Sequence, residues 1–261
     1  MYEDFEVKTS YKYLQEVIKV LNEPICMLGG WAVFFHVNEK FEIAQGRPYL
    51  GSRDIDLGFH LKESISNIEL KNSALAHTIS ILTTKLKFKH LSFRLFKEIH
   101  TETEEEIQEG QFLPAHFIFP VFIDIIVDNI PKNFKEIMGF NPIDEPLLRK
   151  AFEKRENQTE VKEFRKKIIL PVPELLLAMK INSMPNRDKE HKRVKDICDI
   201  FALLWYTGIK SDEARNSALK FTTEAKIKKY ARSITEEDIQ KASTQINHST
   251  VEIKRVLDLL Q

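Results

Sequence analysis

The fold is decided by the stretch Gly51-Ser52-Arg53-Asp54-Ile55-Asp56-Leu57-Gly58-Phe59, in which two carboxylates alternate with apolar residues. Alternate side chains of a strand lie on opposite faces of the sheet. Asp54 and Asp56 are therefore predicted to share a face, with Cα atoms about 6–7 Å apart, while Ile55 and Leu57 enter the core. We predict a core strand over 54–60. A surface strand that shows two acids to water is the alternative.

A glycine pair precedes this strand in Met27-Leu28-Gly29-Gly30-Trp31-Ala32. It joins a short apolar strand, predicted over 25–28, to an apolar helix, predicted over 31–40. Glycines at such a turn let backbone N–H groups approach an anion, and the helix N-terminus favours negative charge. A simple tight turn would explain the glycines equally well. Together with the two acids downstream, however, the turn favours a site for a metal and a triphosphate, because Mg²⁺ takes oxygen ligands from carboxylates and phosphates.

A third acid, Asp124, lies in the apolar run Phe122-Ile123-Asp124-Ile125-Ile126. Burying a carboxylate without a partner is costly, so Asp124 should have one. A metal shared with Asp54 and Asp56 is one candidate partner, and a salt bridge in a structural role is the alternative. On a neighbouring strand, Asp124 would complete a three-carboxylate cluster that binds metal and helps to accept the proton of an attacking hydroxyl.

Composition excludes several classes of protein. The 261 residues carry 39 basic and 39 acidic side chains, so any surface for a polyanion must be local. The only two cysteines, Cys26 and Cys198, lie far apart in apolar runs, which predicts buried, inert thiols in a reducing compartment. The longest apolar stretch, 117–127, is too short to span a bilayer, and the acidic N-terminus is unlike a signal peptide. We expect a cytoplasmic protein with no membrane partner.

The pattern of the whole chain predicts an α+β fold. A mixed α/β domain is expected over 1–145 and a mainly helical domain over 146–261, since Asn and Pro residues punctuate the chain between the two. Pro120 predicts a sheet edge or a bulge. The remaining strands are expected at 88–100 (one or two), 116–127 and 166–170. The remaining helices are expected at 11–22, 72–86, 146–156, 173–185, 190–207, 211–232, 235–243 and 249–260.

The helical half adds a cation and two acids. Lys180 is the one lysine of the apolar helix predicted over 173–185, and it either reaches a triphosphate or extends to solvent. Asp196 and Asp199, three residues apart, should share a helix face. Residues 150–195 hold 13 Lys and Arg against 7 Asp and Glu, an excess of six. That excess fits either a surface for a polyanion such as RNA or an ordinary solvated face.

These residues together resemble the AbiEii-type nucleotidyltransferases of the wider DNA polymerase β-like nucleotidyltransferase superfamily. The resemblance covers roughly residues 20–207. The Gly-Gly and Asp-x-Asp pair is that of the superfamily, and the second-half segment narrows it to the AbiEii type. The motifs that carry it are Gly29-Gly30-Trp31-Ala32, Ser52-Arg53-Asp54-Ile55-Asp56-Leu57, Ile123-Asp124-Ile125, Pro173-Glu174-Leu175-Leu176 to Lys180, Arg187, and Lys195-Asp196 to Asp199-Ile200.

The resemblance implies transfer of a nucleotide from an NTP with release of pyrophosphate, and Mg²⁺ or Mn²⁺ as cofactor. Asp54 and Asp56 match the metal-binding pair of the family, and Asp124 matches its third carboxylate. Gly29 and Gly30 match the phosphate loop, and Lys180 and Asp196 match catalytic or nucleotide-contacting positions, where Asp196 would orient Lys180 or the acceptor. The resemblance also implies a mixed sheet with flanking helices, followed by a helical C-terminal half. The chain departs from the family at Trp31, where many members carry Ser or Thr. A hydroxyl contact to the phosphates would then have to come from Ser52.

Many proteins of the AbiEii type are toxins of toxin–antitoxin pairs, and some modify the 3′ end of tRNA. The resemblance therefore implies an NTP as substrate, tRNA or another RNA as acceptor, and a cognate antitoxin as partner. Two alternatives stay open: a non-catalytic nucleotide- or RNA-binding protein on the same fold, and a nucleotidyltransferase that modifies a small molecule such as an aminoglycoside.

Overall fold

The computed structural model describes residues 4–22 and 24–261. The chain forms two compact units. The sheet unit contains the described residues up to Gly29 together with 51–170, and the helical unit contains 30–50 and 171–261. A mixed sheet with helices, followed by a helical C-terminal region, confirms the predicted α+β class.

The boundary between the units differs from the expected one at 145/146. Residues 146–170 belong to the sheet unit because strand β8 (Lys166–Pro171) pairs in parallel with β1 (Ile25–Met27) and so extends the sheet. Residues 30–50, which we expected to belong with the sheet, group with the helical unit.

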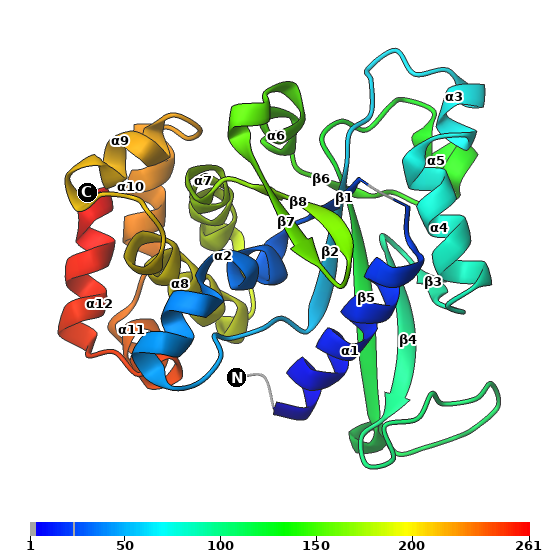
Figure 1. Ribbon diagram of the computed structural model, residues 1–261, viewed down its shortest axis with the longest axis horizontal. Coiled ribbons are helices and arrows are strands. Elements are labelled where there is room, and N and C mark those ends of the chain that lie inside the picture. The colour runs from blue at the N-terminus through cyan, green and yellow to red at the C-terminus, as the bar shows by residue number, and fades with distance from the viewer. Residues whose placement is uncertain (1–3, 23) are drawn as a thin grey trace. The chain divides into compact units, whose positions relative to one another are not determined.

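The sheet has eight strands in the order β3-β4-β5-β2-β1-β8-β7, with β6 beside β5 (Figure 1). The pairs β2–β5, β5–β6 and β1–β8 are parallel, and β1–β2, β3–β4 and β4–β5 are antiparallel. The other strands are β2 Asp54–Phe59, β3 Lys89–Leu91, β4 Arg94–His100, β5 Ile118–Val127, β6 Ile143–Asp144 and β7 Gln158–Glu163.

Burial follows the alternation of the strands. Ile55 and Leu57 are buried, whereas Asp54 and Asp56 remain partly exposed, so the predicted inward and outward faces of β2 are confirmed. Pro120 lies in β5, a strand with neighbours on both sides. The β2 partner begins only opposite Phe122, so at Pro120 the ladder has β4 alone beside it, and an imino residue is tolerated there.

One long helix and several short helical segments complete the sheet unit. Helix α1 (Asp4–Val20) contacts β5 and β2, and it buries Leu14, Val17 and Ile18. The remaining helical segments are α3 Asn67–Lys71, α4 Ala74–Thr84, η1 Ala115–Phe117, α5 Phe134–Met138, α6 Leu148–Glu153 and η2 Arg155–Asn157. Helix α4 begins where the Ser73 hydroxyl accepts a hydrogen bond from the backbone N–H of Ala76, which matches the expected helix over 72–86.

The helical unit is built around α8 (Glu190–Tyr206), which contacts α7, α11 and α12. The expected helix over 211–232 is two helices, because Thr223 caps a new one by accepting a hydrogen bond from Lys226 N–H. Helix α2 runs from Gly29 to Gln45, longer at both ends than expected. The other segments are α7 Pro173–Ser183, η3 Met184–Asn186, η4 Ser211–Glu213, α9 Ala214–Leu219, α10 Glu224–Ser233, α11 Glu236–Ile246, α12 Thr250–Leu257 and η5 Asp258–Leu260.

Both cysteines are free and buried, as predicted. Burial raises the pKa of the Cys26 thiol to about 12, so the reactive thiolate is suppressed. Among residues 4–22 and 24–261, no helix combines the length and the apolar character needed to cross a membrane.

Candidate functional site

The three predicted carboxylates lie on one face of two adjacent strands of the sheet unit. Strands β2 and β5 run parallel, with Asp56 opposite Asp124 and Asp54 opposite Phe122. Residues two apart on a strand share a face, so Asp54 and Asp56 lie on the same face as Asp124. We call this surface the carboxylate face. The sequence pattern predicted the shared face of Asp54 and Asp56, and the register adds Asp124 directly beside them.

Arg94, which the sequence reasoning missed, is the partner of Asp124. It begins β4 directly opposite Asp124 and donates two hydrogen bonds to it, from Nε to Oδ1 at 2.8 Å and from a terminal nitrogen to Oδ2 at 2.7 Å. The same terminal nitrogen lies 3.9 Å from Oδ2 of Asp54. The guanidinium carbon lies 4.2 Å from the ring centre of Phe122 and 4.9 Å from that of Phe93.

This pair gives Asp124, which is only 6% exposed, the partner that burial requires. The structure shows the ion pair that was one of the two expected partners of Asp124, and the metal role stays a prediction. The available signal was a single arginine at the head of an alternating apolar strand. To identify this arginine as the partner of Asp124, one would need to know that its strand lies next to the strand of Asp124.

Gly29 is needed because of Asp56. Its φ of +61° is in the left-handed region, which favours glycine. A Cβ added there would lie 2.7 Å from Cγ of Asp56 and closer still to Oδ2. The Asp56 carboxylate therefore lies against the first residue of α2, where the helix N-terminus favours negative charge. Gly30 is buried in the first turn of the helix, and Ser52 is buried just before β2.

The carboxylates differ in how well they fit a metal ion. No group of three or more His, Cys, Asp or Glu side chains in the described parts of the chain is arranged to hold an ion. Arg94 takes one hydrogen-bonding position on each oxygen of Asp124 and leaves the other lone pairs of those oxygens unused by the pair. Asp54 and Asp56, however, are partly exposed and share a face. Two carboxylates suffice for Mg²⁺ when substrate phosphates complete its shell, so the pair fits an ion that arrives with a nucleotide.

Lys180 and Asp196 meet in a buried ionic cluster of the helical unit. The ammonium of Lys180, 8% exposed, lies 2.7 Å from Oδ1 of Asp196 and 2.7 Å from Oδ2 of Asp199. Nε of Arg187 donates to the other oxygen of Asp196 at 2.8 Å. Lys180 therefore does not extend to solvent, which was one of its two expected placements.

The charges of this cluster hold one another ionised. Burial lowers the pKa of Lys180, but the attraction of Asp196 and Asp199 is larger and raises it above the ordinary value. Burial raises the pKa of Asp196, but the Lys180 and Arg187 charges outweigh it, so the net shift is downward. Such reciprocal shifts are typical of buried ion pairs as well as of catalytic sites.

Asp199 has two further partners, of which Lys195 is at i,i+4 on the same helix and Tyr49 is distant in sequence. The Tyr49 hydroxyl donates to its Oδ1 at 2.9 Å, and the ammonium of Lys195 pairs with the same oxygen. Burial and the Asp199 charge together raise the pKa of Tyr49 well above its ordinary value, so the phenol stays protonated. The cluster thus ties the segment after α2 to helices α7 and α8 within the helical unit.

The basic stretch 150–195 is divided between the two units. Its residues up to 170 belong to the sheet unit and the others to the helical unit. Several of its cations are paired: Lys150 with Glu153, Lys154 with Glu156, and Lys167 with Glu160. The local excess of charge in the sequence is therefore spread over two units in space.

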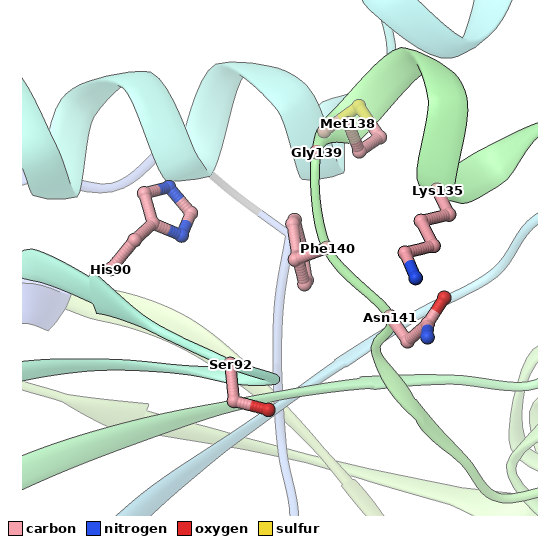
Figure 2. Close-up of a pocket in the computed structure, with 7 residues that line it drawn as sticks. All are labelled: His90, Ser92, Lys135, Met138, Gly139, Phe140 and Asn141. Atoms are coloured by element: carbon pink, nitrogen blue, oxygen red, sulfur yellow. The ribbon is translucent and has the colours of Figure 1, made fainter.

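A cavity of about 410 Å³ lies in the sheet unit away from the carboxylate face. Figure 2 shows its lining: strand β3 and the turn after it, helix α5, and the segment that follows α5. The rings of His90 and Phe140 are 5.5 Å apart, centre to centre. His90 pairs with Leu95, the neighbour of Arg94 along β4, so it lies on the opposite face of the sheet from Arg94. The cavity contains none of the predicted site residues.

Comparison with family models and with curated proteins gives no match for this chain. Among solved structures, the chain is similar to an antigenic nucleotidyltransferase-like protein from Paracoccidioides brasiliensis. The two share 16% sequence identity and a TM-score of 0.40 over 93% of each chain. At that level the similarity does not assign the chain to a family or an activity, and the AbiEii resemblance stays a prediction.

Proposed function

We propose that this chain transfers a nucleoside monophosphate from an NTP to a hydroxyl of an acceptor, with release of pyrophosphate. The acceptor in this proposal is RNA, such as the 3′ end of a tRNA, as in toxin–antitoxin systems. One observation carries the proposal: Asp54, Asp56 and Asp124 lie on one face of β2 and β5, with the carboxylate of Asp56 against Gly29.

The reaction assigns a role to each group of this face. The acceptor oxygen forms a bond to the α-phosphorus, and the bond from that phosphorus to the pyrophosphate oxygen breaks. A bound Mg²⁺ would neutralise charge on the phosphates. Asp54 and Asp56 would hold that ion, and Asp124 would accept the proton of the attacking hydroxyl. Arg94, released from Asp124, would be a cation beside the transferred phosphoryl group.

The roles of the glycine turn with Ser52, and of Lys180, are proposed because of the family resemblance. Gly29, Gly30 and Ser52 would border the triphosphate at the start of α2. Lys180 would contact a phosphate only after leaving Asp196 and Asp199, which hold its ammonium at 2.7 Å. Its replacement is therefore expected to lower stability as well as activity.

The test is transfer of label from each of the four α-labelled NTPs to total RNA, with Mg²⁺ or Mn²⁺. The decisive variant is Asp56→Asn, which keeps the shape of the side chain and removes its charge. We expect a loss of labelling of at least about 100-fold, the scale seen when one stabilising contact to a transition state is removed. Asp144→Asn, at an exposed carboxylate of β6, is the matched control. Equal labelling by wild type and Asp56→Asn would overturn the proposal.

The Arg94–Asp124 pair favours a second candidate, a non-catalytic nucleotide-binding protein. Asp124 is already satisfied by two hydrogen bonds, so the fold does not require it to bind a metal or a proton. This candidate predicts NTP binding that persists in Asp124→Asn and no release of pyrophosphate. The proposed transferase predicts pyrophosphate release that Asp124→Asn abolishes.

A further inference from the structure

The carboxylate face continues across β4 and β3 as a basic and aromatic surface. The strand register places two rows of side chains side by side. One row runs Leu91, Arg94, Asp124, Asp56, and the adjacent row runs Lys89, Phe96, Phe122, Asp54. Because the members of each pair 89/91, 94/96, 122/124 and 54/56 are two residues apart, all eight share one face of the sheet. The acids occupy β2 and β5, and the aromatic and basic residues occupy β3, β4 and β5.

Solvent reaches this surface. Leu91 is 49% exposed, and Phe93, in the turn between β3 and β4, is 37% exposed. Phe96 and Phe122, which face each other across β4 and β5, are partly exposed, and Lys89 is exposed. A contiguous patch of exposed apolar side chains is often a binding surface, whereas single exposed apolar side chains are common and need no explanation. We call Lys89, Phe93, Arg94, Phe96 and Phe122 the platform.

The cation and the aromatic rings of the platform indicate what kind of ligand it binds. The Lys89 side chain makes no ion pair or hydrogen bond with any described residue. Lys89 is two strand spacings from β5, about 10 Å. Aromatic rings with a cation at their margin are the combination that binds single-stranded nucleic acid, in which bases stack on the rings and phosphates meet the cations. Glu98, the next residue of β4 on this face, bounds the platform on the side away from Arg94.

The position of the platform identifies which substrate it serves. Asp124 lies between Arg94 on one side and Asp56 on the other, and Gly29 lies against Asp56. In the proposed reaction the triphosphate occupies the Gly29 side. The side over β4 and β3 is then left for an acceptor hydroxyl that approaches Asp124. We propose that the platform binds the single-stranded end of a polynucleotide acceptor, with bases stacked on Phe96 and Phe122 and a phosphate at Lys89. This inference rests on the proposed function for its assignment to the acceptor.

The test measures binding without catalysis. A fluorescein-labelled, single-stranded 12-nucleotide RNA of mixed sequence is titrated with the full chain in EDTA and without NTP, and anisotropy is followed. The variant Phe96→Leu keeps an apolar side chain on β4 but removes the ring, and Lys89→Ala removes an exposed cation. Lys71→Ala, at an exposed lysine of α3, is the charge-matched control. Thermal unfolding of each variant checks that it folds.

We expect roughly tenfold weaker binding for Phe96→Leu, because one base–aromatic stack has that effect. For Lys89→Ala we expect the slope of log K against log salt to fall in magnitude by about 0.7, the value for one phosphate contact of a single strand. Lys71→Ala should bind as the wild type does. The same titration with single-stranded DNA of identical base sequence shows whether the platform distinguishes ribose from deoxyribose.

The outcomes separate this inference from the proposed function. Weaker binding by both variants supports the platform, even if no NTP yields a labelled product. Wild-type affinity in both variants, or no binding of RNA and DNA by the wild type, overturns it. RNA labelling by the wild type that is unchanged in Phe96→Leu and Lys89→Ala would sustain the transferase proposal and overturn the platform alone.

Discussion

Replacement of Gly29 by alanine tests the geometry on which the site depends. The backbone of Gly29 has a φ of +61°, and the space that a Cβ would fill is taken by the carboxylate of Asp56, with Cγ at 2.7 Å. Two separate costs therefore arise in Gly29→Ala. The first is the left-handed backbone of an L-residue, and the second is the displacement of Asp56.

The two costs can be given sizes. A non-glycine residue in the left-handed region costs about 1–2 kcal/mol. Moving the Asp56 side chain away from its rotamer adds about 0.5–1.5 kcal/mol. The free energy of unfolding should therefore fall by about 1.5–3.5 kcal/mol. Gly139→Ala isolates the first cost, because Gly139 is also left-handed, at φ +79°, and a Cβ there would have no atom within 4 Å.

The assay is urea unfolding of a double-mutant cycle. In an Asp56→Ala background the carboxylate is absent and only the Cβ of residue 56, at 3.3 Å, stays close to the added Cβ, so Gly29→Ala should cost little more than Gly139→Ala does. We expect a coupling energy of about 1 kcal/mol between positions 29 and 56, above the 0.3–0.5 kcal/mol within which independent sites add. A coupling energy near zero, or equal costs for Gly29→Ala and Gly139→Ala, would refute the contact between Gly29 and Asp56.

Two further predictions concern the ionic cluster of the helical unit. Lys180→Met leaves Asp196 and Asp199 buried with one cation fewer and should lower the free energy of unfolding by about 3–5 kcal/mol. Lys210→Met, whose side chain is 71% exposed, should change it by less than about 0.5 kcal/mol, and equal effects in urea unfolding would contradict the buried pair. Because the net pKa shift of Asp196 is downward, its stabilisation is present above the ordinary Asp pKa of about 3.9 and is lost as pH falls through the folded pKa. Asp196→Asn should therefore flatten the acid side of a stability–pH curve, and an unchanged acid side would contradict the assigned pKa shift.

The sequence was sufficient for features that depend on local periodicity. Asp54 and Asp56 share a face because the strand period is two, and the apolar residues between them fixed which face is buried. Helix α4 begins near the expected residue because Ser73 is a helix cap. Strand β7 was not predicted, because Gln158–Glu163 contains a single aliphatic residue and therefore has no apolar alternation.

Features that depend on which elements become neighbours could not be predicted. Arg94 is thirty residues from Asp124, and only the placement of β4 beside β5 brings them together. Lys180 alone on an apolar helix predicted either a solvent-exposed or a phosphate-binding cation. The resemblance had added Asp196 as a group that orients Lys180, and the packing of α7 on α8 brings Asp199 to the same ammonium as well.

The charges of the carboxylate face lead to a last prediction. Asp54, Asp56, Asp124 and Arg94 together carry a formal charge of −2, so a bare triphosphate approaching them would be repelled. If the proposed function holds, the NTP binds only with a divalent cation. Calorimetric titration should show ATP binding with Mg²⁺ and at least about tenfold weaker binding in EDTA. Arg94→Met makes the four positions more negative and should deepen that dependence, whereas Arg149→Met, at a partly exposed arginine paired with Glu63, should not. ATP binding of equal strength with and without the cation would show that these carboxylates do not face the phosphates.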